Sequence, residues 1–231
     1  MLKKEEKEEK EEKEEKEEKE ENKEEDEKEE KGKDNIIFKI ITLGDSGVGK
    51  TSIINRYAKN IFNENNASTI GLNFVIKDVN FNKKEKFKLK LMDTCGQEKY
   101  MSLTKSYLKN ADGVLFIFAF NDKDSFDNIK DWMDFYDKNS IKKIPQMLLG
   151  NKCDLKSEID ENLIDEFVKK KNIEYIKTSA KNKINIKESI NNMGKALYEN
   201  NKPSDSKKQK LILSYKKEKE HHGCFLCTTS I

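Results

Sequence analysis

The sequence lacks any long apolar run, and this absence limits the classes of protein to which it can belong. The longest apolar stretch is only Gly113–Phe120, and the chain starts with a run of charged residues. A membrane-spanning helix needs about 20 apolar residues, and a secretory signal peptide needs an apolar segment close to the start. We therefore expect neither a membrane span nor a secretory signal here.

Cysteine is also scarce, with four residues in a chain of 231. Cys95, Cys153, Cys224 and Cys227 do not form the evenly spread pairs of a disulfide framework. Disulfides are rare in reducing compartments, where thiols stay free. The sequence therefore favours a cytoplasmic protein.

Hydrophobic residues make up only 34% of the chain, against 39% charged residues, and the ends of the chain explain much of this imbalance. Residues 1–34 hold 11 Lys, 17 Glu and 2 Asp, a net charge of 11 − 19 = −8. Since the whole chain carries +2, the remainder carries +10. The Glu-Glu-Lys repeat of residues 4–19 has no apolar face with which to build a core. We interpret residues 1–34 as a low-complexity Glu/Lys arm, and an acidic docking role for it stays open.

Residues 35–200 alternate short apolar runs with amphipathic stretches, which predicts one α/β domain. The predicted strands are Ile36–Leu43, Asn73–Phe81, Lys86–Met92, Gly113–Phe120, Gln146–Gly150 and Glu174–Thr178. The predicted helices are Lys50–Lys59, Ser125–Lys138, Ile159–Lys171 and Asn185–Glu199. Alternation of this kind produces mostly parallel sheets with helices on both faces. The polar turn Asn82–Glu85 predicts a hairpin between the second and third strands. Residues 201–231 are predicted to form a basic, cysteine-containing flexible tail.

One segment has the pattern of a phosphate-binding loop. Gly44–Thr51 matches G-x-x-x-x-G-K-[ST] and lies between a predicted strand and a predicted helix. The glycines let successive backbone N–H groups face phosphate oxygens, at the positive end of the following helix. Lys50 is predicted to bind the terminal phosphates, and the Thr51 hydroxyl is predicted to bind Mg²⁺. We assign to this site Asp45, Ser46, Gly47, Val48, Gly49, Lys50, Thr51 and Ser52.

A second segment, Asp93–Glu98, follows a predicted strand at the sheet edge where open α/β folds bind ligands. Asp93 is predicted to hold Mg²⁺ through water, and Gly96 to offer its N–H to a γ-phosphate. Gln97 is placed to orient the attacking water, as such a glutamine does in GTPases. An Asp in this position is also a common helix cap or turn residue, but the upstream phosphate loop favours the catalytic interpretation. The predicted catalytic residues are Gln97, Lys50 and Gly96.

A third pair of segments predicts a guanine site. Asn151-Lys152-Cys153-Asp154 and Thr178-Ser179-Ala180-Lys181 each end a predicted strand. The Asp154 carboxylate can accept hydrogen bonds from N1–H and from the 2-amino group of guanine. Adenine offers neither donor, so binding of the wrong base would leave buried acceptors unpaired. The stem of Lys152 can lie on the base, Asn151 can tie this loop to the phosphate loop, and the Ala180 N–H would reach the guanine O6. Ser179 and Lys181 complete the predicted guanine-binding residues.

With these motifs in this order, the chain resembles the small GTPases of the Ras superfamily and, within it, most of all the Rab family. The resemblance covers residues 36–200, and its Rab-like markers are Ser68–Phe74, Lys88–Met92, Tyr100–Thr104 and Tyr107–Ala111. It implies the P-loop small GTPase fold, an α/β fold with a six-stranded, mostly parallel sheet, one antiparallel strand and helices on both faces. It also implies that Thr69 binds Mg²⁺ in the GTP state and that Phe62 contacts the guanine.

The resemblance further implies a Mg²⁺-dependent switch that hydrolyses GTP to GDP in membrane or vesicle traffic. Its partners would be a guanine nucleotide exchange factor, a GTPase-activating protein and effectors; no nucleic-acid partner is expected. The site has no arginine of its own, which predicts slow intrinsic turnover. Met92 replaces a tryptophan that is common in the family, so we expect altered partner contacts at the surface. Asn66 replaces a common tyrosine, so we expect weaker closure over the nucleotide. A nucleotide-loaded scaffold with little hydrolysis is the alternative, and a P-loop kinase would need an acceptor-binding insert that this domain lacks.

The tail resembles the lipid-carrying ends of Rab proteins without matching their usual pattern. Cys224 and Cys227 follow the lysines of residues 207–217, but Cys227 is fifth from the end, so the sequence is not C-a-a-X. Prenylation would place the protein on the cytosolic face of an intracellular membrane, with the lysines favouring an anionic leaflet. A metal site that adds His221 and His222 to the two cysteines is a second interpretation, and an unmodified tail is a third.

Overall fold

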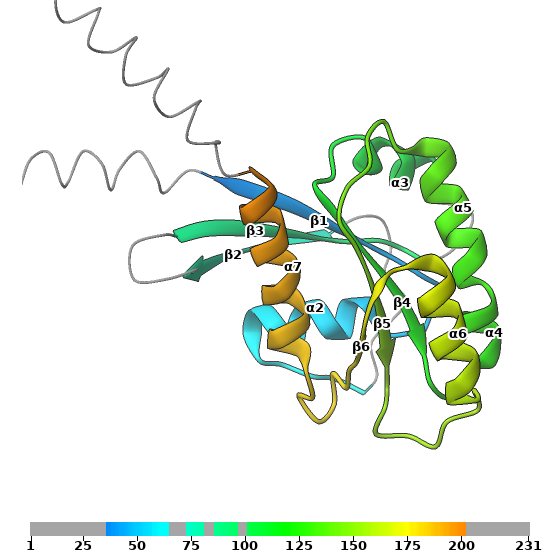
Figure 1. Cartoon of the computed structure of the whole chain (residues 1–231). Helices are drawn as coiled ribbons and strands as arrows, with labels where there is room; N and C mark the ends of the chain where they lie inside the picture. The colour runs from blue at the N-terminus through cyan, green and yellow to red at the C-terminus, as the bar shows by residue number, and fades with distance from the viewer. Residues whose placement is uncertain (1–35, 65–72, 81–85, 97–100, 202–231) are drawn as a thin grey trace, which may run out of the picture.

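The structure, a computed structural model, describes residues 36–64, 73–80, 86–96 and 101–201 (Figure 1). Its strands are β1 (Ile37–Leu43), β2 (Asn73–Asn80), β3 (Lys86–Asp93), β4 (Gly113–Ala119), β5 (Gln146–Asn151) and β6 (Glu174–Lys177). They form one six-stranded sheet in the order β2-β3-β1-β4-β5-β6. Only the β2–β3 pair is antiparallel, and the other pairs are parallel. The sheet and helices confirm the predicted fold class.

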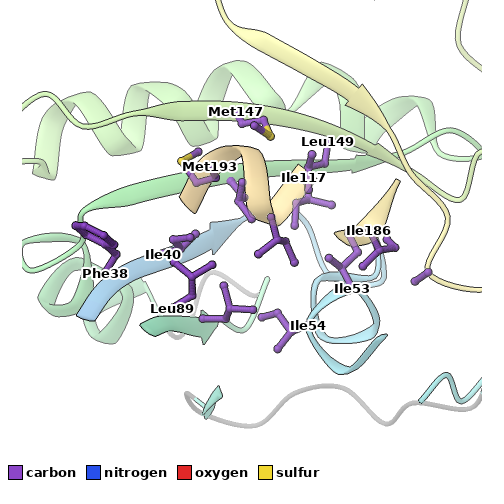
Figure 2. Close-up of a cluster of buried hydrophobic side chains, with 14 of the residues drawn as sticks. Phe38, Ile40, Ile53, Ile54, Leu89, Ile117, Met147, Leu149, Ile186 and Met193 are labelled. Carbon is purple, nitrogen blue, oxygen red and sulfur yellow. The ribbon is translucent and has the colours of Figure 1, made fainter. Parts of the chain in front are cut away.

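Helices cover both faces of this sheet, and alternate strand residues supply the two cores. The helices are α2 (Lys50–Lys59), α3 (Met101–Leu108), α4 (Lys123–Asp127), α5 (Ile129–Asn139), α6 (Glu161–Lys171) and α7 (Ile186–Asn201). Along β4, Leu115 and Ile117 belong to the core under α2 and α7, where Figure 2 labels Ile117. Phe116 and Phe118 belong to the core under α3 to α6. This alternation follows from the two-residue period of a strand. Because both faces are covered, β4 is buried along its whole length.

The predicted helix Ser125–Lys138 was wrong as a single element, because the structure divides it into α4 and α5 at Asn128. Helix α4 begins earlier than predicted because the Asp122 carboxylate accepts from the Ser125 N–H and caps it. The buried Ser125 hydroxyl in turn donates to the Asp122 carbonyl and accepts from the Ala119 N–H. The polar residues before the helix thus belong to its start. The predicted helix Lys50–Lys59 agrees with α2 at both ends, and the other predicted strands and helices differ from the structure by at most two residues at an end, as is usual for such boundaries.

Met92 also corrects an expectation. We expected this residue on the surface that partners contact, but its side chain is only 2% exposed. It packs in the same core as Ile41 and Leu108, because the last residues of β3 are covered on that face. Methionine fits such a site well because its unbranched side chain adapts to irregular gaps. Met92 therefore belongs to the core and not to the exposed surface.

The two ends of the described domain lie together at one end of the sheet (Figure 1). The carbonyl of Ile36 accepts from the N–H of Lys88 near the start of β3. Near the end of α7, Tyr198 stacks on Phe87, whose ring also contacts Phe38. The loops that follow β1, β3, β4, β5 and β6 lie at the opposite, carboxyl end of the parallel strands. No helix in the described ranges is long and apolar enough to cross a membrane.

Candidate functional site

A pocket of about 440 Å³ lies at the carboxyl edge of the sheet, where loops after β1, β3, β5 and β6 meet. The predicted site residues that line it are Ser46, Gly47, Gly49, Lys50, Thr51, Ser52, Phe62, Gly96, Asn151, Lys152, Asp154, Ala180 and Lys181. Ligands of open α/β sheets bind at this edge. The structure therefore brings residues from five separate sequence segments to one place.

The loop after β1 encloses the first part of the pocket, and its shape requires glycine. Gly47 and Gly49 have φ values of 82° and 98°, a region that side chains rarely adopt. A Cβ on Gly49 would also lie 2.3 Å from the Asn151 side-chain nitrogen. The loop ends at the N-terminus of α2, so its N–H groups and the helix dipole favour an anion at the same point.

Lys50 is a buried cation at the centre of this loop, with only 5% of its surface exposed. Its ammonium donates to the carbonyl oxygens of Gly44 at 2.9 Å and Asp45 at 2.6 Å. Burial lowers the pKa of Lys50 to about 8, although the nearby Asp93 carboxylate raises it in part. A phosphate group would restore the favourable environment of the charged form.

Thr51 and Asp93 meet on the other side of Lys50. The Thr51 hydroxyl donates to the Asp93 carboxylate at 2.7 Å, and Asp93 is buried at the end of β3. A hydroxyl and a carboxylate side by side are the oxygen ligands that Mg²⁺ prefers, with phosphates and water completing its shell. Within the described ranges, no group of three or more His, Cys, Asp or Glu could hold a metal by itself. The residues present thus fit Mg²⁺ bound jointly with a phosphate.

Gly96 lies directly against the phosphate loop. A Cβ added to Gly96 would come within 2.4 Å of the Asp45 carbonyl carbon and the Ser46 nitrogen, so only glycine allows this approach. The segment before it is fixed by Thr94, whose buried hydroxyl donates to the Thr42 carbonyl at 2.6 Å. The segment that follows β3 is therefore held to β1 by Thr94, two residues before Gly96 contacts the phosphate loop. Gln97 and Thr69 lie outside the described residues.

Asn151 joins the phosphate loop to the loops on the far side of the pocket. Its side-chain N–H₂ donates to the carbonyl of the fully buried Val48 at 2.8 Å. Its side-chain oxygen accepts from the Ala180 N–H at 3.3 Å and from the Thr178 hydroxyl at 3.5 Å. One amide thereby fixes three loops relative to one another. Val48 does not line the pocket and contributes through its backbone carbonyl.

Asp154 and Ser179 form the second connection on this far side. The Ser179 hydroxyl donates to the Asp154 carboxylate and accepts from the Asn182 N–H. Ser179 is fully buried, so it orients the carboxylate from behind without lining the pocket. Lys152 precedes Asp154 with a left-handed φ of 61°, which turns the chain sharply between the two residues. Asp154 is thus a pocket carboxylate held in one orientation.

Asp45 occupies a different place from the one expected for a ligand-binding side chain. Its carboxylate accepts from the indole N–H of Trp132 at 2.6 Å and from the Asn128 side chain at 2.8 Å. It therefore ties the phosphate loop to the start of α5. Sequence reasoning missed both partners; the only available signal was their i,i+4 spacing on an amphipathic helix.

Sequence reasoning also missed some residues of the pocket wall, namely Asn63, Glu64, Thr94, Cys95 and Leu155. Thr94 and Cys95 lie inside the Asp93–Glu98 motif, whose spacing could have indicated them. Glu64 had no such signal, because its partner Lys181 is distant in sequence. The two form an exposed ion pair at 2.7 Å, which lowers the pKa of Glu64 and raises that of Lys181.

Phe62 lines the far side of the pocket, and Arg56 supports it from outside the lining. The guanidinium of Arg56 lies 5.8 Å from the centre of the half-buried Phe62 ring, on the face that supports a cation–π contact. Arg56 also donates to the carbonyls of Ala180 at 2.7 Å and Lys181 at 3.2 Å. The aromatic ring and the loop after β6 are consequently held by the same side chain.

These features define a nucleotide-binding protein of the P-loop class. A model described as "Ras family" matches residues 39–199 of the chain. The chain therefore belongs to the Ras family of GTP-binding switch proteins, whose members are GTPases.

Similar curated proteins include several Rab proteins. The chain is 36% identical over 178 residues to Ras-related protein Rab-13 of Bos taurus, covering 72% of this chain and 87% of that protein. It is 38% identical over 163 residues to Ras-related protein Rab-1D of Dictyostelium discoideum, covering 70% and 79%. It is 34% identical over 165 residues to GTP-binding protein ypt1 of Schizosaccharomyces pombe, covering 71% and 81%. The predicted resemblance to Ras-superfamily GTPases and to Rab proteins is confirmed.

Proposed function

We propose that this protein binds GTP with Mg²⁺, hydrolyses it to GDP and phosphate, and uses the difference between the two states as a Rab-like switch. The observation that carries this proposal is the double hydrogen bonding of Asn151. It joins Val48 of the phosphate loop to Ala180 of the far loop, so a phosphate site and a base site form one pocket. A single bound nucleotide spans such a pocket.

In this proposal the phosphate half binds through the loop N–H groups and the ammonium of Lys50. Mg²⁺ would be held by Thr51, by Asp93 through water, and by Thr69 in the GTP state. Bound Mg²⁺ neutralises charge on the phosphate oxygens. The approach of Gly96 to the phosphate loop supports a role in which its N–H contacts a γ-phosphate. Loss of that phosphate would release the chain that follows Gly96.

The base half would select guanine through Asp154. Its carboxylate is oriented by Ser179 and can accept from N1–H and the 2-amino group together. Lys152 would cover one face of the base and Phe62 its edge, while the Ala180 N–H would face the guanine O6. Lys181, which lies at the pocket mouth opposite Glu64, would close this side.

The position of the single arginine of the chain supports the proposal that intrinsic GTP hydrolysis is slow. Arg56 donates to the carbonyls of Ala180 and Lys181, on the base side of the pocket. It is therefore engaged away from the phosphates, and the site has no arginine of its own to stabilise charge on the transferring phosphoryl group. A GTPase-activating protein that supplies this charge would accelerate turnover by about 10³–10⁵-fold.

The test of hydrolysis is Gln97→Leu. We expect GTP affinity to change little, while single-turnover hydrolysis with Mg²⁺ slows at least ~10-fold, because only the positioning of water is lost. A Gln97→Glu variant is the matched control for side-chain size. An unchanged rate in Gln97→Leu would remove Gln97 from the mechanism and favour the nucleotide-loaded scaffold.

We further propose that the protein acts in membrane traffic and attaches to the cytosolic face of an intracellular membrane through its tail. The similarity to Rab proteins supports this role, and the lysines of residues 207–217 followed by Cys224 and Cys227 support the attachment. One prenyl chain with a basic patch can suffice for binding, and two anchor more firmly. Replacement of both cysteines by Ser should move the protein from the membrane to the soluble fraction of a cell lysate. Deletion of residues 1–34 should leave the membrane fraction unchanged.

A further inference from the structure

A second groove, of about 610 Å³, lies outside the nucleotide pocket and shares no lining residue with it. It runs between α2, the second half of β2 and the start of α7. The charged residues along it are Arg56, Lys77, Lys183 and Lys187 on the basic side and Asp78 on the acidic side. Its formal charge is therefore 4 − 1 = +3. A groove of this sign is complementary to an acidic ligand.

The basic side chains of this groove are not neutralised by acidic neighbours. Arg56 donates to backbone carbonyls, and the ammonium of Lys77 donates to the Ala58 carbonyl at 3.2 Å. Within the part of the chain that the structure describes, neither Lys183 nor Lys187 forms an ion pair within 4 Å. The one acidic residue, Asp78, is directed to Lys88 at 3.9 Å. The positive charge of the groove is thus available to a ligand.

The lining of the groove combines the apolar residues Val79 and Ile186 with a fixed polar pair. The hydroxyl of Tyr57 on α2 donates to the side-chain oxygen of Asn191 on α7 at 2.9 Å. Burial raises the pKa of Tyr57 to about 12, so this hydroxyl keeps its proton at neutral pH. The hydrogen bond holds the two helical walls together. A groove that is held in shape and lined by four basic residues suits an extended acidic segment.

We propose that this groove binds an acidic segment of the same chain, Glu20–Glu30. This segment holds eight acidic residues and two lysines, a net charge of 2 − 8 = −6, and is the most acidic part of the arm. Residues 1–19, with seven lysines and ten glutamates, carry only 7 − 10 = −3. The tail, residues 201–231, carries 7 − 3 = +4, which the groove would repel. This inference goes beyond the proposed GTPase function and does not depend on it.

The geometry allows the segment to reach the groove within one molecule. Ile36, the first described residue, bonds to Lys88 on β3, and Lys88 is paired with Asp78 on β2, which lines the groove. Two strand spacings separate Ile36 from the groove edge, a distance of about 10 Å. The five residues between Glu30 and Ile36 can span about 17 Å when extended. The linker is therefore long enough, and its shortness keeps the acidic segment near the groove.

The test is zero-length cross-linking of the full chain, which joins a carboxylate to a lysine amine only when the two are in contact. We expect mass spectrometry to find links from Glu20–Glu30 to Lys77, Lys183 and Lys187 at least fivefold more often than to Lys170 and Lys195, two exposed lysines outside the groove. The preference should fall severalfold at about 0.5 M salt, since salt screens such contacts. A mixture of isotope-labelled and unlabelled chains should show that the links form within one molecule.

Two double variants with the same change in charge distinguish binding of the acidic segment in the groove from its general electrostatic attraction to the domain. Lys183→Glu with Lys187→Glu should reduce links to Lys77 at least fivefold, whereas Lys170→Glu with Lys195→Glu should leave them unchanged. Equal losses in both variants would overturn the proposal. It would also be overturned by links spread evenly over all exposed lysines, or by links that join the arm mainly to the lysines of residues 202–219.

Discussion

The two halves of the nucleotide pocket are built in different ways. The phosphate half is a continuous loop whose shape comes from glycine conformations, and its lysine is held by backbone carbonyls of the same loop. The base half is assembled from side chains on separate segments, with Asn151 and Ser179 fixing their neighbours. From this difference we infer that the phosphate half would supply affinity through many similar contacts, while the base half would supply selectivity through one carboxylate. Substitutions in the two halves should therefore differ in whether the loss of binding depends on the base.

The largest effect is expected in the base half, at Asp154. Asp154→Ala should weaken GTP binding at least ~100-fold, because the guanine loses both of its carboxylate contacts. Binding of ITP, which lacks the 2-amino group, should fall much less. Competition binding of the two nucleotides measures the difference, and Ser179→Ala, which keeps the carboxylate but removes its partner, should give an intermediate loss. Equal losses for GTP and ITP would mean that Asp154 does not read the base.

An intermediate effect is expected in the phosphate half, at Asp45. Asp45→Ala should accelerate GDP dissociation about tenfold. The substitution removes the two hydrogen bonds by which the Asp45 carboxylate connects the phosphate loop to the start of α5. The change should be the same for GDP and IDP, since this half does not distinguish bases. Trp132→Phe, which removes the indole N–H, supplies the matched variant for a double-mutant cycle. Additive effects of the two substitutions would contradict the tie.

The smallest effect concerns protonation of Lys50. Because burial lowers its pKa to about 8 in the free protein, half of it is neutral near pH 8, and a bound diphosphate should return it to the charged form. GDP binding should therefore be accompanied by the uptake of about half a proton at pH 8 and of almost none at pH 6.5. As a consequence, the affinity for GDP should be constant below about pH 7 and should fall as the pH rises through 8. Calorimetry in buffers of different ionisation enthalpy measures this uptake. Lys50→Arg, which stays charged, should show none; uptake that persists in that variant would assign the proton to another group.

The sequence predicted those parts of the fold and site that depend on neighbouring residues. The mostly parallel sheet follows from the alternation of strands and helices, and the loop Gly44–Thr51 is readable because the residues of its motif occupy eight consecutive positions. The link from Asp45 to Trp132 was not readable, because the two residues lie 87 positions apart and meet only in the folded domain. The division of the predicted helix at Asn128 was missed for a similar reason, since the buried Ser125 hydroxyl bonds to β4. Side chains whose partners are set by tertiary packing carry little local signal.

Trp132 is the only tryptophan of the chain, and its indole N–H is bonded to the phosphate loop through Asp45. Indole emission responds to hydrogen bonding and to the polarity around the ring. This protein therefore contains one intrinsic fluorophore, located at the loop that would contact the phosphates, in a background without competing indoles. Selective excitation of Trp132 would allow nucleotide exchange to be followed in real time on the unlabelled chain.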